Sequence, residues 1–128
     1  MIVIIAPSLD DKRIYPIRSL QPGGVFRSRA VIRHASGKGA NAARAAARLG
    51  ADVSLVAPAG EEFHALLDEQ LGYLGVRLEI TPTRLPTRSC ITVLEENGRA
   101  TELVQEALPM EKDEVLRFER DALGAIDA

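Results

Sequence analysis

A glycine turn that leads directly into an alanine-rich segment, between His34 and Gly50, constrains this chain more than any other feature. Gly37 and Gly39 allow positive φ angles and close backbone approach. The alanines that follow have high helix propensity, Leu49 and the small alanines can pack closely on a sheet, and Gly50 stands where a left-handed C-terminal cap is expected. The sequence therefore predicts a sharp turn that opens a helix packed on a sheet.

The start of this helix is suited to a polar ligand. Its first amide groups have no partner within the helix, and the helix dipole places partial positive charge there. Lys38 adds a full charge, and Asn41 adds both a donor and an acceptor. The turn therefore suits a polyhydroxylated or phosphorylated small molecule. From the residues alone, an equally good interpretation is that Gly37 and Gly39 only reverse the chain.

Two nucleotide-binding motifs fit the turn poorly. A Walker phosphate loop is excluded, because Gly39 follows Lys38 where Ser or Thr is required and Ile32 stands in place of the first glycine. A dinucleotide fingerprint would be Gly37-x-Gly39-x-x-Ala42, but the acids about twenty positions further on open the next helix instead of ending a strand. A small nucleotide-binding module is thus a distant alternative.

The bulk composition excludes several classes of function. A chain of 128 residues with 46% hydrophobic residues fits one domain with a buried core. The formal charge of -2 and the 4% aromatic content argue against binding to nucleic acid or to an anionic membrane. Cys90 is the only cysteine, so no internal disulfide can form. The opening residues lack a basic leader, and we expect a cytoplasmic location.

Hydrophobic periodicity predicts two kinds of strand, separated by helices. Ile2–Ala6 is a continuous apolar run, typical of a strand buried on both faces, Val53–Ala57 is a second buried strand, and Val76–Ile80 is a third candidate strand. Alternating runs, typical of strands with one exposed face, occupy Arg13–Ile17, Val25–Arg33, Ser89–Glu95 and Ala100–Gln105, with turns at 21–24 and 96–98. Further helices are predicted at 61–74 and 110–123. The pattern favours an α/β layer that carries a small separate sheet.

This order of elements, together with three short motifs, resembles the amino-terminal part of a PfkB-type sugar kinase of the ribokinase-like superfamily. The motifs are Ser36-Gly-Lys-Gly-Ala-Asn41, Thr87-Arg88-Ser-Cys-Ile-Thr-Val and Thr101-Glu102-Leu-Val. The resemblance spans nearly the whole chain. It is most like fructose-1-phosphate kinase or tagatose-6-phosphate kinase.

The resemblance implies a particular fold and organisation. The expected fold is a ribokinase-like three-layer core fragment with a mainly parallel sheet, plus a small antiparallel lid sheet from about 12–33 and 88–105. Residues 1–128 would then be a single substrate-binding and lid portion of such a kinase. In the family the lid closes over the substrate and often clasps a partner subunit, so the resemblance implies a homo-oligomer, such as a dimer, formed through the lid strands.

The resemblance also assigns substrate-binding roles. Asp10 would hydrogen-bond sugar hydroxyls, and the sugar-contacting turn would consist of Gly37, Lys38, Gly39 and Asn41. From the residues alone, Asp10 is as simply explained as the end of a strand. The sugar or sugar phosphate itself is not specified by the motifs.

Two further residues lie on the expected lid. Arg88 would meet the phosphate of a phosphorylated sugar, for which a guanidinium fork is well shaped, although a solvated strand end explains it equally well. Glu102 would be a lid acid at the sugar, or would form a cross-strand pair with Arg99. The sequence predicts no catalytic residue and no metal ligand.

Several positions depart from the family pattern. Ala6 stands where the family usually has Asn, Ser36 where it has glycine, and Ala107-Leu108-Pro109 where Gly-Pro is common. These departures leave the sugar open.

The family's catalytic motif, Gly-Ala-Gly-Asp, and its pocket for ATP and Mg²⁺ are absent from these 128 residues. ATP and Mg²⁺ are implied for the full-length family member, with phosphoryl transfer to a sugar hydroxyl, whereas the isolated chain is predicted to be inactive. The alternative is a degenerate, non-catalytic half-kinase that acts as an oligomerising or binding module.

Overall fold

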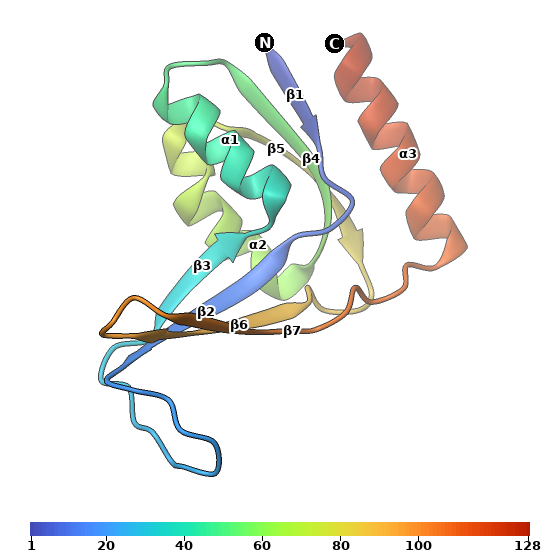
Figure 1. The fold of residues 1–128 in the computed structure, drawn as a ribbon. Coiled ribbons are helices and arrows are strands. Elements are labelled where there is room, and N and C mark those ends of the chain that lie inside the picture. The colour runs from blue at the N-terminus through green and yellow to red at the C-terminus, as the bar shows by residue number, and fades with distance from the viewer.

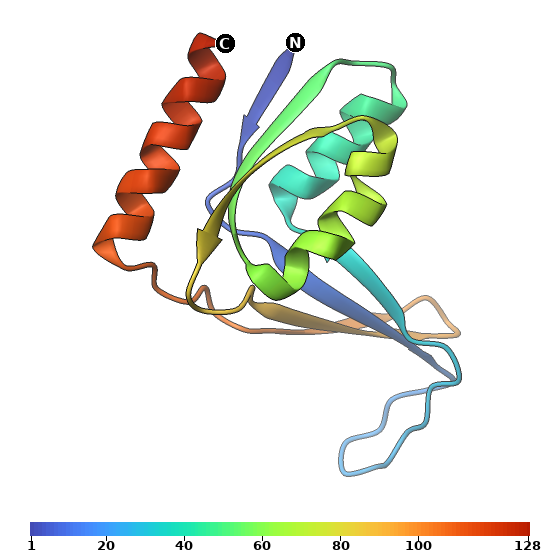
Figure 2. The same ribbon diagram turned by 180° about the vertical axis from the view of Figure 1, so that it is seen from behind.

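A computed structural model describes all residues, 1–128, and shows two sheets with helices around one of them (Figure 1). The first sheet is parallel, in the order β1-β4-β5, and consists of β1 (Ile2–Ile5), β4 (Val53–Gly60) and β5 (Arg77–Thr83). Helices α1 (Lys38–Arg48) and α2 (Glu61–Gln70) cover one face, and α3 (Lys112–Asp127) covers the other, as Figure 2 shows from behind. We call this three-layer part the body.

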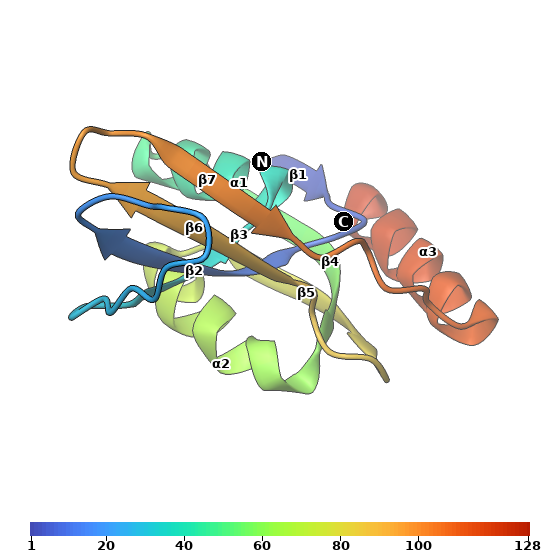
Figure 3. The same ribbon diagram turned by 60° about the horizontal axis from the view of Figure 1, so that its bottom comes forward.

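The second sheet, which we call the lid sheet, extends from one end of the body (Figure 3). Its order is β3-β2-β6-β7, with β2 (Asp10–Ile17), β3 (Ile32–Ser36), β6 (Ser89–Glu95) and β7 (Ala100–Val104). Strands β2 and β3 are antiparallel, as are β6 and β7, but β2 and β6 run parallel. The α/β class with a mainly parallel core is therefore confirmed, and the lid sheet is mixed because its two antiparallel pairs join along a parallel ladder.

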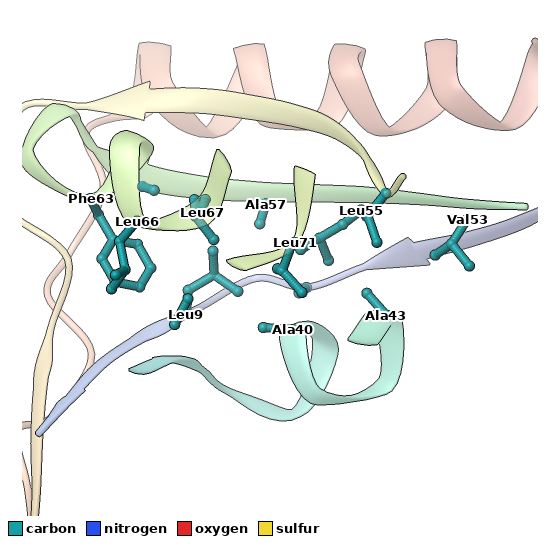
Figure 4. Close-up of a cluster of buried hydrophobic side chains, with 14 residues drawn as sticks. Leu9, Ala40, Ala43, Val53, Leu55, Ala57, Phe63, Leu66, Leu67 and Leu71 are labelled. Carbon is teal, nitrogen blue, oxygen red and sulfur yellow. The ribbon is translucent and has the colours of Figure 1, made fainter. Parts of the chain in front are cut away.

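The core lies in the body, around β4. All eight residues of β4 are buried, as expected of a parallel strand covered on both faces. Leu55 and Ala57 pack with α1 and α2, whereas Val56, which points to the opposite face, packs with Ala122 and Ala125 of α3. Figure 4 shows the larger cluster, in which α2 contributes several large apolar side chains. This alternation is what holds helices on both faces of the sheet.

The strand predicted at Val25–Arg33 is wrong for most of its length. Strand β3 begins only at Ile32, and it pairs with the first half of β2, from Asp10 to Ile14. The residues between the two strands therefore form a long exposed loop rather than a tight hairpin. Within this loop the Ser28 hydroxyl donates to the carbonyls of Pro16 and Ala30, so local side-chain bonds take the place of a ladder.

Other boundaries differ by smaller amounts. Helix α2 ends at Gln70 and is followed by the short 3₁₀ helix η1 (Gly72–Leu74), where a single helix to residue 74 was predicted. Gly50 has a φ angle of 84°, which confirms the predicted left-handed position after α1, and Gly75 has a φ angle of 83° in the same position after η1. No helix combines the length and apolar character needed to cross a membrane.

Candidate functional site

The lid sheet meets the body at the carboxyl ends of the parallel strands, where open α/β sheets commonly bind ligands. A cavity of about 240 Å³ lies at this junction. Its walls come from the ends of β4 and β5 and from the segments that follow β1, β5 and β7. They consist of Pro7, Ser8, Leu9, Pro58, Ala59, Thr83, Leu85, Pro86, Thr87, Arg88, Ala107, Leu108, Pro109 and Met110. Arg88 is the one charged residue among them. We call this space the junction cavity.

Arg88 and Asp10 form an ion pair beside the junction cavity. The Arg88 Nε group donates to Asp10 Oδ1, and their side chains are 24% and 14% exposed. The backbone supports the pair, because the amide of Asp11 donates to the carbonyl of Arg88 at 2.9 Å. Asp10 begins β2 and Arg88 immediately precedes β6, and these two strands run parallel and so start at the same edge of the lid sheet. The structure thus brings together two residues assigned separately to the sugar and its phosphate.

The glycine turn packs against the segment that carries Asp10. Gly37 has a φ of 107°, and a Cβ there would lie 3.2 Å from the Cα of Leu9. A Cβ on Gly39 would lie 2.3 Å from the Cβ of Ala6. Both glycines are therefore required for close approach of backbones, which supports the turn interpretation without excluding a ligand.

The start of α1 leaves amide donors free. No side chain caps the helix, and the amide of Asn41 is the first to bond, to the carbonyl of Gly37 at 2.9 Å. The amides of Lys38, Gly39 and Ala40 have no protein acceptor. The Lys38 side chain is exposed. This end of the helix can donate to an anion or to hydroxyl oxygens.

Asn41 is exposed, and its Oδ1 atom accepts a hydrogen bond of 3.0 Å from Nη1 of Arg44. The junction cavity includes neither Asn41 nor Asp10. The glycine turn and the cavity are instead joined through the segment Pro7–Leu9, which lines the cavity and contacts Gly37. A single ligand would have to extend from the cavity along this segment to reach both.

Glu102 lies on β7, does not line the junction cavity, and forms its hydrogen bonds within the lid sheet. It accepts hydrogen bonds from Lys12 Nζ at 2.8 Å and from the Thr92 hydroxyl at 3.0 Å. The bond from Lys12 holds the pKa of Glu102 below its usual value and raises the pKa of Lys12. Arg99 pairs with Glu95 instead, so the cross-strand pair of Glu102 with Arg99 was a wrong alternative.

The sequence analysis did not single out most residues that line the cavity. Pro58 and Ala59 are at the end of β4, and Thr83 is the last residue of β5. The predicted parallel strands could have pointed to these lining residues, because the carboxyl ends of such strands must meet at one edge of the sheet. No group of three or more His, Cys, Asp or Glu side chains is close enough to share a metal ion.

Comparison with known proteins agrees with the fold. Residues 3–125 match the sequence model of the pfkB family of carbohydrate kinases. Phosphofructokinase-2 from Escherichia coli, solved in complex with fructose-6-phosphate, superposes with a TM-score of 0.88 at 24% identity, over 96% of this chain and 41% of that one.

Two further structures are similar. A possible 1-phosphofructokinase from Thermotoga maritima gives a TM-score of 0.81 at 18% identity, over 92% of this chain and 39% of that one. Ribokinase from Cryptococcus neoformans var. grubii serotype A, in complex with ADP, gives 0.68 at 23% identity, over 84% and 35%. The chain therefore spans less than half the length of these proteins, and the likeness to them concerns the fold.

Proposed function

Because this chain belongs to the pfkB family of carbohydrate kinases, we propose that it forms the sugar-binding and lid part of a sugar-phosphate kinase. The observation that carries this proposal is the Arg88–Asp10 pair, which sets a guanidinium at the wall of the junction cavity and a carboxylate next to it. A guanidinium can bind a phosphoryl group through two parallel hydrogen bonds, and a carboxylate accepts from sugar hydroxyls.

The glycine turn is the second part of the proposed site. Free amides of Lys38 and Gly39, with the exposed side chains of Lys38 and Asn41, offer donors to sugar oxygens. A phosphorylated sugar long enough to pass along Pro7–Leu9 would reach Arg88 and this turn together. Fructose-6-phosphate, bound by the similar E. coli protein, belongs to that class.

Calorimetry with fructose-6-phosphate, fructose-1-phosphate and tagatose-6-phosphate tests this function. We expect binding to at least one, and loss of about tenfold or more in affinity in Arg88→Ala, because a charge-assisted pair is removed. Arg120→Gln, which changes an exposed arginine on α3, is the control and should bind normally. A folded protein that binds none of the three in the millimolar range would contradict the proposal.

ATP and Mg²⁺ would supply the transferred phosphoryl group and its charge neutralisation in the full-length protein. ADP is bound in the similar ribokinase. The residues described here offer no metal-ligating cluster, and we assign them no step of phosphoryl transfer. We therefore expect no ADP production by this chain alone when ATP and the sugar phosphates are supplied.

A second function, as an oligomerising module, is favoured by the surface of the lid sheet. Its strands and loop expose large apolar side chains at Val25, Phe26, Val31, Ile32, Leu94, Leu103 and Val104. Strands β3 and β7 are also the unpaired edges of this sheet. Light scattering should show a dimer that Leu103→Lys dissociates, whereas Leu49→Lys, at an exposed leucine after α1, should not. A monomer at high concentration would contradict assembly.

A further inference from the structure

A second cavity, of about 300 Å³, lies on the side of the body where β3 enters α1 and where α2 passes into η1. These elements are side by side in Figures 1 and 2. The lining residues are His34, Arg44, Arg48, Gln70, Tyr73 and Leu74. None of them lines the junction cavity. We call this space the basic cavity.

The basic cavity holds positive charge without a carboxylate to balance it. Arg44 is the one buried arginine of the chain, at 9% exposed, and it donates only to neutral oxygens, the Asn41 side chain at 3.0 Å and the Ala35 carbonyl at 2.7 Å. Arg48 forms no ion pair either. A buried charge is costly unless it is paired, so this arrangement favours an anion.

The buried acids of the chain, unlike Arg44, have oppositely charged partners. Asp11, Glu95 and Glu114 each lie within ion-pair distance of an arginine. The charged groups that act on His34 and Arg44 are the cations Lys12, Arg44 and Arg48, and of these three Lys12 is itself paired with Glu102. Burial and then these cations lower the pKa of His34, and burial and then Arg48 lower the pKa of Arg44. Among the buried charged side chains of the chain, Arg44 is thus the one without an oppositely charged partner.

We propose that the basic cavity binds a small phosphorylated anion, at a site that shares no lining residue with the junction cavity and adjoins the glycine turn through the bond from Arg44 to Asn41. Arg44 supplies a guanidinium already fixed by two hydrogen bonds, Arg48 supplies a second from the next turn of α1, and the half-buried His34 faces them from β3. A phosphoryl group has several acceptor oxygens and can bond to both guanidinium groups, which suits this pair better than a ligand with a single carboxylate. The exposed Tyr73 lies at the rim.

The test must separate this site from Arg88, which can also bind phosphate. Titration with inorganic phosphate at constant ionic strength, followed by amide chemical shifts, should perturb signals of β3, α1 and η1. Arg48→Gln is the informative variant, because Arg44 is tied to Asn41 and to the backbone and its loss would disturb the fold. We expect Arg48→Gln to weaken phosphate binding at these signals about tenfold.

Two further variants serve as controls for this titration. Arg88→Gln should leave the phosphate shifts of β3 and η1 unchanged, and Arg120→Gln should leave all of them unchanged. The proposal is overturned if phosphate shifts only the junction-cavity residues and Arg88→Gln removes them, a result that leaves the proposed function intact. It is equally overturned if Arg48→Gln and Arg120→Gln weaken binding alike, because surface charge alone then explains it.

Discussion

The body and the lid sheet are held together by different forces. Both hydrophobic clusters lie in the body and in its connection to β2, and β3 contributes only Ala35 to them. The lid sheet instead carries ion pairs, such as Lys12 with Glu102 and Arg99 with Glu95, on a ladder of backbone hydrogen bonds. Apolar burial contributes more free energy than exposed ion pairs. The body should therefore govern the stability of the chain, and the lid sheet should open first.

The largest expected effect that tests this contrast is on the core of the body. Phe63 of α2 is fully buried in the larger hydrophobic cluster, beside Leu66 in Figure 4. Phe63→Ala should lower the free energy of unfolding by about 3–5 kcal/mol, because a large cavity replaces the ring. In the monomer, at low protein concentration, Leu103→Ala, at a residue of the lid sheet that is 63% exposed, should change it by less than about 0.5 kcal/mol. Chemical denaturation measures both, and equal losses would refute the contrast.

A smaller effect is expected where the two regions join. Gly39→Ala places a Cβ 2.3 Å from that of Ala6, and we expect a loss of about 1–3 kcal/mol in the free energy of unfolding from overpacking. Gly124→Ala is the matched control within α3, where a Cβ meets nothing within 4 Å. It should stabilise the chain by up to about 1 kcal/mol through helix propensity. Thermal unfolding reports both, and a stabilised Gly39→Ala would show that the junction tolerates bulk.

Acid should loosen the lid sheet. Hydrogen bonds from Arg99 and from the Leu20 amide hold the pKa of Glu95 below its usual value of 4.5. Below about pH 4.5 the unfolded state then binds more protons than the folded state, so the stabilisation by Glu95 is lost as the pH falls. Hydrogen exchange at amides of β6 and β7 should accelerate with acid before that of β4.

Glu95→Gln sharpens this result. It should raise the exchange of β6 and β7 amides at neutral pH and flatten the acid dependence, because the titrating group is gone. Loss of protection in β4 at the same pH as in β6, in the unmodified chain, would contradict separate opening of the lid sheet.

The smallest effect concerns a surface pair of the body. Arg77 and Asp52 lie 3.0 Å apart, with side chains 55% and 63% exposed. Asp52→Asn should cost no more than about 1 kcal/mol, and high salt should reduce even that. A loss comparable with that of Phe63→Ala would mean that ion pairs also stabilise the body.

The sequence predicted the body better than the lid sheet. Apolar runs located β1 and β4, the candidate strand at Val76–Ile80 located β5, and the Asn97-Gly98 pair located the β6–β7 turn, where Gly98 has a φ of 87°. These signals are local. The parallel pairing of β2 with β6 joins residues about 78 positions apart, as from Asp11 to Ser89, and no local pattern encodes it.

The same limit applies to the candidate site. The turn at Gly37 could be predicted because its glycines are needed locally, and resemblance to a family suggested Asp10 and Arg88. Their mutual contact depends on the β2–β6 register and could not be predicted. The basic cavity was missed for a similar reason, since Arg44 and Tyr73 come from separate elements.

Gly37 alone connects β3 to α1. The chain passes between the body and the lid sheet at residues 6–9, 37, 84–88 and 105–111, and the passage at Gly37 is a single residue long. A connection of one residue is too short to absorb a movement of the lid sheet relative to α1. Any tilt of the lid sheet must turn the first peptide planes of α1. The angle of the lid sheet and the direction of those amide groups therefore change together.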